Sequence, residues 1–129
     1  MVAFLSQDWL DALRSSMEGL PASPGASALV QFVVNGAPEG NVVYSTQYDD
    51  GRVVDAAVGK PAGDPDLTVT LAYDDAVRLA RGDLELSAAY MQGTVKVEGD
   101  MARLFALLPA THRPPYKAAI TDLAAKTDF

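Results

Sequence analysis

Residues 66–108, DLTVTLAYDDAVRLARGDLELSAAYMQGTVKVEGDMARLFALL, contain the pattern that decides the fold. Apolar and polar residues alternate from Leu67 to Tyr73, which predicts a strand with one buried face. The spacing becomes helical from Asp75 to Gly82, and a second short helix follows. A strand at 94–98 then precedes an apolar helix that Asp100 is expected to cap. The stretch therefore predicts the order strand, helix, helix, strand, helix.

The upstream part of the chain predicts one helix and three strands. Ser6 is expected to cap the helix, since apolar residues follow it at helical spacing. The strands are expected at residues 30–34, 42–48 and 52–58. Asp50-Gly51 is a tight-hairpin signal because both positions tolerate a positive φ. In the third strand, the alternation predicts that one face holds Val54, Ala56 and Val58.

The downstream end is expected to be helical. Pro109 is expected to end the helix that Asp100 caps, because proline cannot donate a helical hydrogen bond. A last helix is expected after Pro114 and Pro115. The three early strands are joined by hairpins and are antiparallel, whereas the long helical connection between the fourth and fifth strands permits a parallel or mixed pairing. The prediction is an α+β fold, with a single five-stranded, mostly antiparallel (mixed) sheet and helices packed mainly on one face.

The composition is typical of an ordinary globular domain. The chain has 129 residues, of which 49% are hydrophobic, so a single domain over residues 1–129 is expected. The net charge of -7 argues against nucleic-acid binding, which needs clustered Lys and Arg. The chain has no cysteine, which excludes disulfides and Cys-based zinc sites. No basic leader and no transmembrane segment of roughly 20 apolar residues is evident, so a cytoplasmic protein is expected.

Few residues are of a kind that could carry catalysis. The single histidine, His112, lies in a proline-bounded segment and is interpreted as a solvated loop residue. The carboxylate pairs suit turns and helix caps, and no phosphate-binding glycine loop is present. Neither a cofactor nor a metal ion is therefore expected. An enzyme is the least favoured function, because it would need His112 within hydrogen-bond reach of a carboxylate inside a cleft.

Short motifs occur in series along the deciding stretch. The alternating strand Asp66–Leu71 is followed by Gly82-Asp83-Leu84. The helix end Ala89-Tyr90-Met91-Gln92-Gly93 comes next, and Lys96-Val97-Glu98-Gly99-Asp100 and Met101 follow it. In this order and at these spacings, the motifs resemble those of the sterol carrier protein type-two family, a family of sterol-binding or lipid-transfer domains.

The resemblance implies an apolar tunnel between the sheet and the helices. It also implies non-enzymatic binding of a fatty acid, a fatty acyl chain or a sterol. Burying a lipid chain gains roughly 0.8 kcal/mol per methylene, so such a site needs no charged constellation. The expected lining consists of apolar residues from the predicted strands and helices. They are Phe32, Leu71, Leu79, Leu86, Tyr90, Met91, Met101, Phe105, Leu108, Tyr116 and Ile120.

An interaction module is the alternative function. In that case the same apolar helix face would pack against an enzyme partner, or against a second copy in a homodimer, and no lipid would bind. An exposed apolar patch of sufficient size marks such an interface. A filled core beneath a wide apolar surface would favour this alternative.

Overall fold

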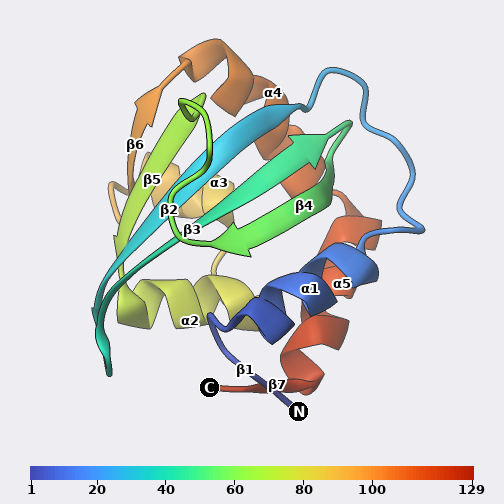
Figure 1. Ribbon diagram of the computed structural model, residues 1–129. Coiled ribbons are helices and arrows are strands. Elements are labelled where there is room, and N and C mark those ends of the chain that lie inside the picture. The colour runs from blue at the N-terminus through green and yellow to red at the C-terminus, as the bar shows by residue number, and fades with distance from the viewer.

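The computed structural model describes residues 1–129 and contains a five-stranded sheet with helices gathered on one side of it (Figure 1). The strands of this sheet are β2 (Ala28–Ala37), β3 (Gly40–Asp49), β4 (Arg52–Val58), β5 (Leu67–Ala72) and β6 (Lys96–Gly99). The helices are α1 (Gln7–Ser16), α2 (Tyr73–Arg81), α3 (Leu86–Met91), α4 (Met101–Thr111) and α5 (Pro114–Ala125). The predicted α+β class is therefore confirmed.

The sheet is mixed, and its one parallel pair involves strands that are distant in sequence. The strand order is β4-β3-β2-β5-β6. Strands β2 and β5 are parallel, whereas β5 and β6 are antiparallel, although two helices connect them. The parallel pairing that the connection permitted for β5 and β6 does not occur, whereas the predicted five-stranded, mostly antiparallel (mixed) sheet is confirmed. Gly99 ends β6 beside the start of β5, where its φ of +123° and the nearby carbonyl of Asp66 leave no room for a Cβ.

The β3–β4 hairpin has the predicted turn and one unpredicted irregularity. Asp50 and Gly51 have φ values of 49° and 84°, as a tight hairpin requires. Tyr48 pairs with Val53 and Gln47 pairs with Asp55, so Val54 is an extra residue in a β-bulge. The bulge shifts the alternation of buried and exposed residues along β4. Val53 is therefore buried, while Val54 and Val58 are 44% and 50% exposed. The predicted shared face of Val54, Ala56 and Val58 was therefore wrong.

The helix ends follow local side-chain chemistry. The Ser6 side chain accepts a hydrogen bond from the Trp9 amide, and Asp100 accepts from the amides of Ala102 and Arg103, so both predicted caps are confirmed. The prediction that Pro109 ends α4 was wrong, since the helix continues to Thr111. Buried Ala110 holds this last turn against the core.

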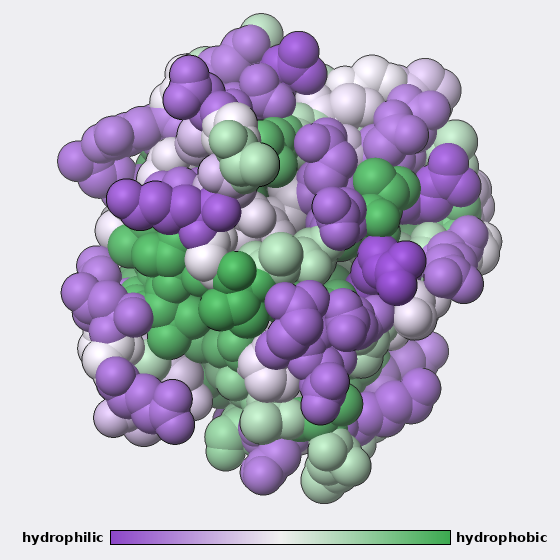
Figure 2. All heavy atoms as spheres, viewed as in Figure 1, coloured by the Kyte–Doolittle hydropathy of each residue, from purple (hydrophilic) through white to green (hydrophobic).

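The buried core lies between the sheet and the helices. Its fully buried side chains come from α1, from the central strands and from α4, and they include Leu10, Val30, Val34, Val69, Leu104 and Leu107. In Figure 1 the helices lie behind and below the sheet. Figure 2 shows the same face covered largely by hydrophilic side chains, with hydrophobic ones gathered over the left part of the sheet above α2. No helix has the length and apolar character needed to cross a membrane.

A second, two-stranded sheet joins the two ends of the chain. Strand β1 (Val2–Ala3) pairs in parallel with β7 (Thr127–Asp128). The amide of Phe4 donates to the carbonyl of Asp128 at 2.9 Å. The ring of Phe4 also packs on that of Phe129, with centroids 5.0 Å apart. The N- and C-termini therefore lie side by side (Figure 1).

Candidate functional site

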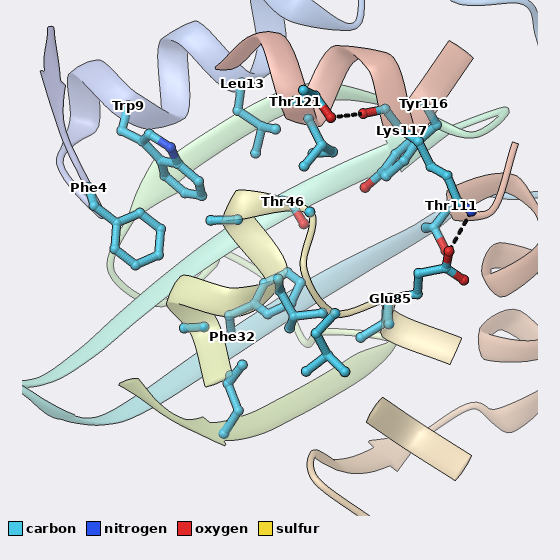
Figure 3. Close-up of a pocket in the computed structure, with 18 of the residues that line it drawn as sticks. Phe4, Trp9, Leu13, Phe32, Thr46, Glu85, Thr111, Tyr116, Lys117 and Thr121 are labelled. Carbon is cyan, nitrogen blue, oxygen red and sulfur yellow. Dashed lines mark hydrogen bonds and ion pairs between the residues drawn. The ribbon is translucent and has the colours of Figure 1, made fainter. Parts of the chain in front are cut away.

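A cavity of about 340 Å³ lies between the sheet and three helices, α1, α2 and α5. Of its 20 lining residues, 14 are hydrophobic. Figure 3 shows Trp9 and Leu13 reaching in from α1, and Tyr116, Lys117 and Thr121 from α5. The sheet supplies the opposite wall, including Phe32. Apolar concave space of this kind is typical of a small-molecule site.

Aromatic rings form one continuous wall of the cavity. Phe4 meets Trp9 edge to face, with ring centroids 4.9 Å apart. Trp9 meets Tyr44 edge to face at 6.0 Å, and Tyr44 stacks on Phe32 at 4.8 Å. These edge-to-face and stacked contacts connect the N-terminal segment to the middle of the sheet.

Hydroxyl groups interrupt the apolar lining along β3. Tyr44, Thr46 and Tyr48 alternate on the cavity face of this strand and are at most 8% exposed. The Tyr48 and Tyr116 hydroxyls lie 3.2 Å apart and form a hydrogen bond. Burial raises the pKa of Tyr44, Tyr48 and Tyr116, so all three remain neutral at physiological pH.

The mouth of the cavity carries its only charged groups. Glu85 and Lys117 are the charged members of the lining, and their side chains form an ion pair across the opening between α5 and the segment that precedes α3. His112 Nδ1 lies 2.6 Å from the second oxygen of the same carboxylate. The hydrogen bond from Lys117 is the main cause that lowers the pKa of Glu85. These side chains are 38% to 59% exposed, so the cluster sits at the surface.

His112 lies in the turn between α4 and α5 with its side chain 59% exposed, so the predicted solvated loop position is confirmed. It caps the C-terminus of α4, and its ring contacts Glu85. The carboxylate contact that an enzyme would need is therefore present. However, His112 does not line the cavity, and the neighbouring Thr111 hydroxyl donates to the Leu108 carbonyl at 2.8 Å. The arrangement thus lacks a free nucleophile beside the histidine.

The structure brings six of the eleven predicted lining residues together around the cavity. They are Phe32, Leu71, Leu79, Leu86, Tyr116 and Ile120. The other five do not line it, and they are Tyr90, Met91, Met101, Phe105 and Leu108. Met91 is 80% exposed and Phe105 is 56% exposed. Tyr90, Met101 and Leu108 are half-buried against the core.

The reason for this division is the position of α3 and α4. Tyr90 on α3 packs on Phe105 of α4, with ring centroids 6.2 Å apart. The two helices therefore cover each other, and apart from Leu86 at the start of α3 and Thr111 at the end of α4 their side chains do not line the cavity. Figure 3 shows the drawn lining arising mainly from α1, α2, α5 and the sheet.

Several lining residues were missed by the sequence analysis. They include Phe4, Trp9, Leu13, Tyr44, Thr46, Tyr48, Glu85 and Lys117. For the β3 residues a signal was present, since polar and aromatic side chains share one face of a strand with hairpin neighbours on both sides. For Glu85 and Lys117 no signal existed, because only the packing of α5 brings them together.

The comparisons with known proteins identify the family. The model of the SCP-2 sterol transfer family matches residues 8–107, so the chain belongs to this family. The matched segment ends before α5, which supplies Tyr116, Lys117, Ile120 and Thr121 to the cavity. That wall therefore lies outside the matched segment.

Two solved structures have the same fold. The solution structure of the conserved hypothetical protein TT1886 from Thermus thermophilus superposes with a TM-score of 0.74 at 16% identity, covering 94% of this chain and 90% of that one. Palmitated SCP2L2 from Aedes aegypti superposes with a TM-score of 0.62 at 17% identity, covering 81% and 92%.

A related segment also occurs within a longer protein. Hydroxysteroid dehydrogenase-like protein 2 of Xenopus laevis is 28% identical over 80 residues, which are 62% of this chain and 18% of that protein. The chain thus spans less than a fifth of the length of this curated relative.

Proposed function

We propose that this domain binds one molecule of an elongated apolar lipid, namely a fatty acid, a fatty acyl chain or a sterol, without covalent chemistry. The observation that carries the proposal is the cavity of about 340 Å³, lined mainly by hydrophobic residues. Small-molecule sites have volumes of about 300–1,000 Å³, so this cavity belongs at the lower end of the range. Its size favours a lipid with one hydrocarbon chain or one fused ring system over a lipid with two chains.

The driving force would be the transfer of hydrocarbon from water. Each buried methylene contributes about 0.8 kcal/mol, so a chain of moderate length binds tightly through apolar contacts alone. The apolar part of the lining offers water few hydrogen-bond partners, so an apolar guest displaces that water at little cost. Membership of a sterol transfer family and the palmitated state of the Aedes aegypti relative support the same ligand class.

We propose that the domain itself carries or presents the lipid and does not transform it. The Glu85–His112 pair could hold a proton, but it stands at the mouth without an adjacent nucleophile. Any chemistry on the ligand would then belong to a partner or to an attached catalytic domain. The presence of a related segment in a longer dehydrogenase-like protein is consistent with such an arrangement.

Filling the cavity tests the proposal. Ala76 lies on α2, is 5% exposed and lines the cavity. Ala76→Phe is expected to lower the affinity for a fluorescent fatty acid at least tenfold, since the added ring occupies the ligand's space. Ala118→Phe, at an exposed position of α5 outside the lining, is the matched control and is expected to bind normally.

The wild-type protein supplies the decisive result. Native mass spectrometry is expected to show a co-purifying lipid mass, and unlabelled fatty acid is expected to displace the fluorescent probe. If the wild type binds no fatty acid, fatty alcohol or sterol at micromolar concentration, the lipid-binding proposal is wrong.

A second candidate function is supported by the surface of α3 and α4. Met91 and Phe105 are large apolar side chains that are 80% and 56% exposed on these neighbouring helices. Such a patch suits contact with a partner subunit, an attached domain or a second copy. Light scattering separates these cases, since Met91→Glu is expected to abolish any dimer that uses the patch. The lipid cavity would be unaffected by that substitution.

A further inference from the structure

We infer that the hydroxyl groups of Tyr44, Thr46, Tyr48 and Tyr116 select a lipid whose polar end is an uncharged hydroxyl and hold that end deep in the cavity. This inference rests on the proposed lipid-binding function and adds to it the polarity and the orientation of the ligand. Three of these residues belong to β3 and one to α5, and all four line the cavity.

The first support is an unpartnered buried hydroxyl. Thr46 is 1% exposed, and its Oγ1 makes no hydrogen bond. Thr46 lies close to Tyr48 and lowers the pKa of its phenol, although burial raises that pKa by more and Tyr116 lowers it by more. The Thr46 and Tyr48 hydroxyls are nevertheless outside hydrogen-bond geometry. Buried polar groups in native proteins are almost always hydrogen-bonded. A ligand oxygen near Thr46 would supply the missing partner.

The second support is the way the hydroxyls converge. In Figure 3 the Thr46 oxygen lies between the side chains of Trp9 and Tyr116, in the middle of the drawn cavity. The hydroxyls of Tyr48 and Tyr116 form one pair, 3.2 Å apart, which retains free acceptor positions. Trp9 Nε1 is also buried without a partner. It lies on the edge of the indole turned toward α1, so it does not belong to this group of hydroxyls.

Packing alone does not require these hydroxyls. Thr46 pairs with Val30 of β2, and Tyr44 pairs with Phe32, so the adjacent strand has purely apolar side chains at the same level of the sheet. Valine in place of threonine and phenylalanine in place of tyrosine would fill nearly the same volume. The hydroxyls therefore point to recognition of a ligand group.

The charge distribution favours a neutral group over a carboxylate. Lys117 is the only cation in the lining, and Glu85 holds it at the mouth. A carboxylate beside Thr46 would be removed from water with no cation to compensate it, which is costly. A hydroxyl both donates and accepts, so it can satisfy Thr46 and a tyrosine together. A lipid carboxylate would instead be retained at the mouth, near Lys117.

A matched pair of ligands tests the inference. The probes are 1-dodecanol and dodecanoate, which have the same chain length and differ in the polar end. Trp9 is the only tryptophan and lines the cavity, so its fluorescence reports binding of either ligand. The wild type is expected to bind dodecanol at least tenfold more tightly than dodecanoate.

Thr46→Val is the decisive variant, because it keeps the shape and removes the hydroxyl. The loss of one buried hydrogen bond corresponds to roughly a threefold to tenfold weaker affinity for dodecanol. Dodecanoate is expected to bind as before. Thr70→Val, on the opposite face of β5, is the matched control and is expected to leave both affinities unchanged. Tyr116→Phe is a second variant, and it is expected to weaken dodecanol in the same way as Thr46→Val.

The outcomes distinguish this inference from the function on which it rests. If dodecanoate binds as tightly as dodecanol, or if Thr46→Val weakens both ligands equally, the hydroxyl cluster does not select the polar end and the inference fails. In that case the cavity still binds lipid. If neither ligand nor the fluorescent fatty acid binds, the lipid-binding function itself fails.

Discussion

Helices α4 and α5 are consecutive and nearly equal in length, yet their apolar side chains serve different surfaces. Each helix buries one stripe in the core, with Leu104 and Leu107 on α4 and Leu123 on α5. The remaining apolar residues differ. On α5, Ile120 lines the cavity, whereas Phe105 on α4 is 56% exposed on the outside. Helical spacing therefore identifies an apolar face without showing whether it meets core, cavity or solvent.

The neighbours of each helix explain the difference. Helix α5 packs beside α1 and α2, and side chains of these three helices surround the cavity. Helix α4 packs against α3 and against the side of the sheet formed by β2 and β5. The cavity lies beneath the first group, whereas buried Leu104 and Leu107 fill the space beneath α4.

The largest effect is expected from the core stripes, where the two helices are alike. Leu104→Ala and Leu123→Ala remove side chains that are 1% and 2% exposed. Each is expected to lower the free energy of unfolding by about 2–5 kcal/mol, measured by urea denaturation. A loss below about 1 kcal/mol in one of them would show that its helix is only loosely held against the core.

The next effect concerns the faces where the helices differ. Ile120→Asp places a charge in the cavity and is expected to weaken lipid binding at least tenfold, which corresponds to about 1.4 kcal/mol. Phe105→Asp is expected to change lipid affinity less than about twofold, because Phe105 lies outside the lining. Fluorescent-probe titration checks both variants. Equal losses of affinity would contradict the division between α4 and α5.

A smaller effect is expected at the start of α4. Asp100 accepts hydrogen bonds from two amides, whereas α5 begins at prolines with no side-chain cap. Asp100→Ala is expected to destabilise the protein by about 1 kcal/mol in thermal or urea unfolding. Asp122→Ala, at an exposed site in α5, serves as the control and is expected to change stability by less than about 0.5 kcal/mol.

The smallest effect is expected at the ion pair of Lys117 and Glu85 at the mouth of the cavity. Lys117 lowers the pKa of Glu85, so this contact stabilises the fold above the ordinary glutamate pKa of about 4.3. The contribution is lost as the pH falls through the lowered pKa of the folded state. Urea midpoints of Glu85→Gln and wild type are expected to differ slightly near neutral pH and to converge in strong acid. Glu39→Gln, an exposed change without an ion pair, is expected to show no such convergence.

The fold was largely predictable because it depends on local patterns. Alternation located β5, the Asp50–Gly51 pair located a hairpin, and Ser6 and Asp100 located helix starts. The bulge at Val54 and the antiparallel pairing of β6 were not predictable, since both depend on contacts between distant residues.

The site was predictable only in part. Tyr116 and Ile120 were identified because they form an apolar set on one helix, and the structure places them in the cavity wall. The same reasoning selected Met91 and Phe105, which lie elsewhere. Glu85 and Lys117 meet only through tertiary packing, so no local pattern could indicate them.

The pairing of β1 with β7 has a consequence for engineering. Because both ends of the chain meet in one small sheet, a short peptide could join them without stretching the backbone. New ends could then be opened at the exposed residues 62–64 of the loop between β4 and β5. Such a circular permutant would carry its fusion tags on the side of the domain away from the joined ends, with the cavity wall intact.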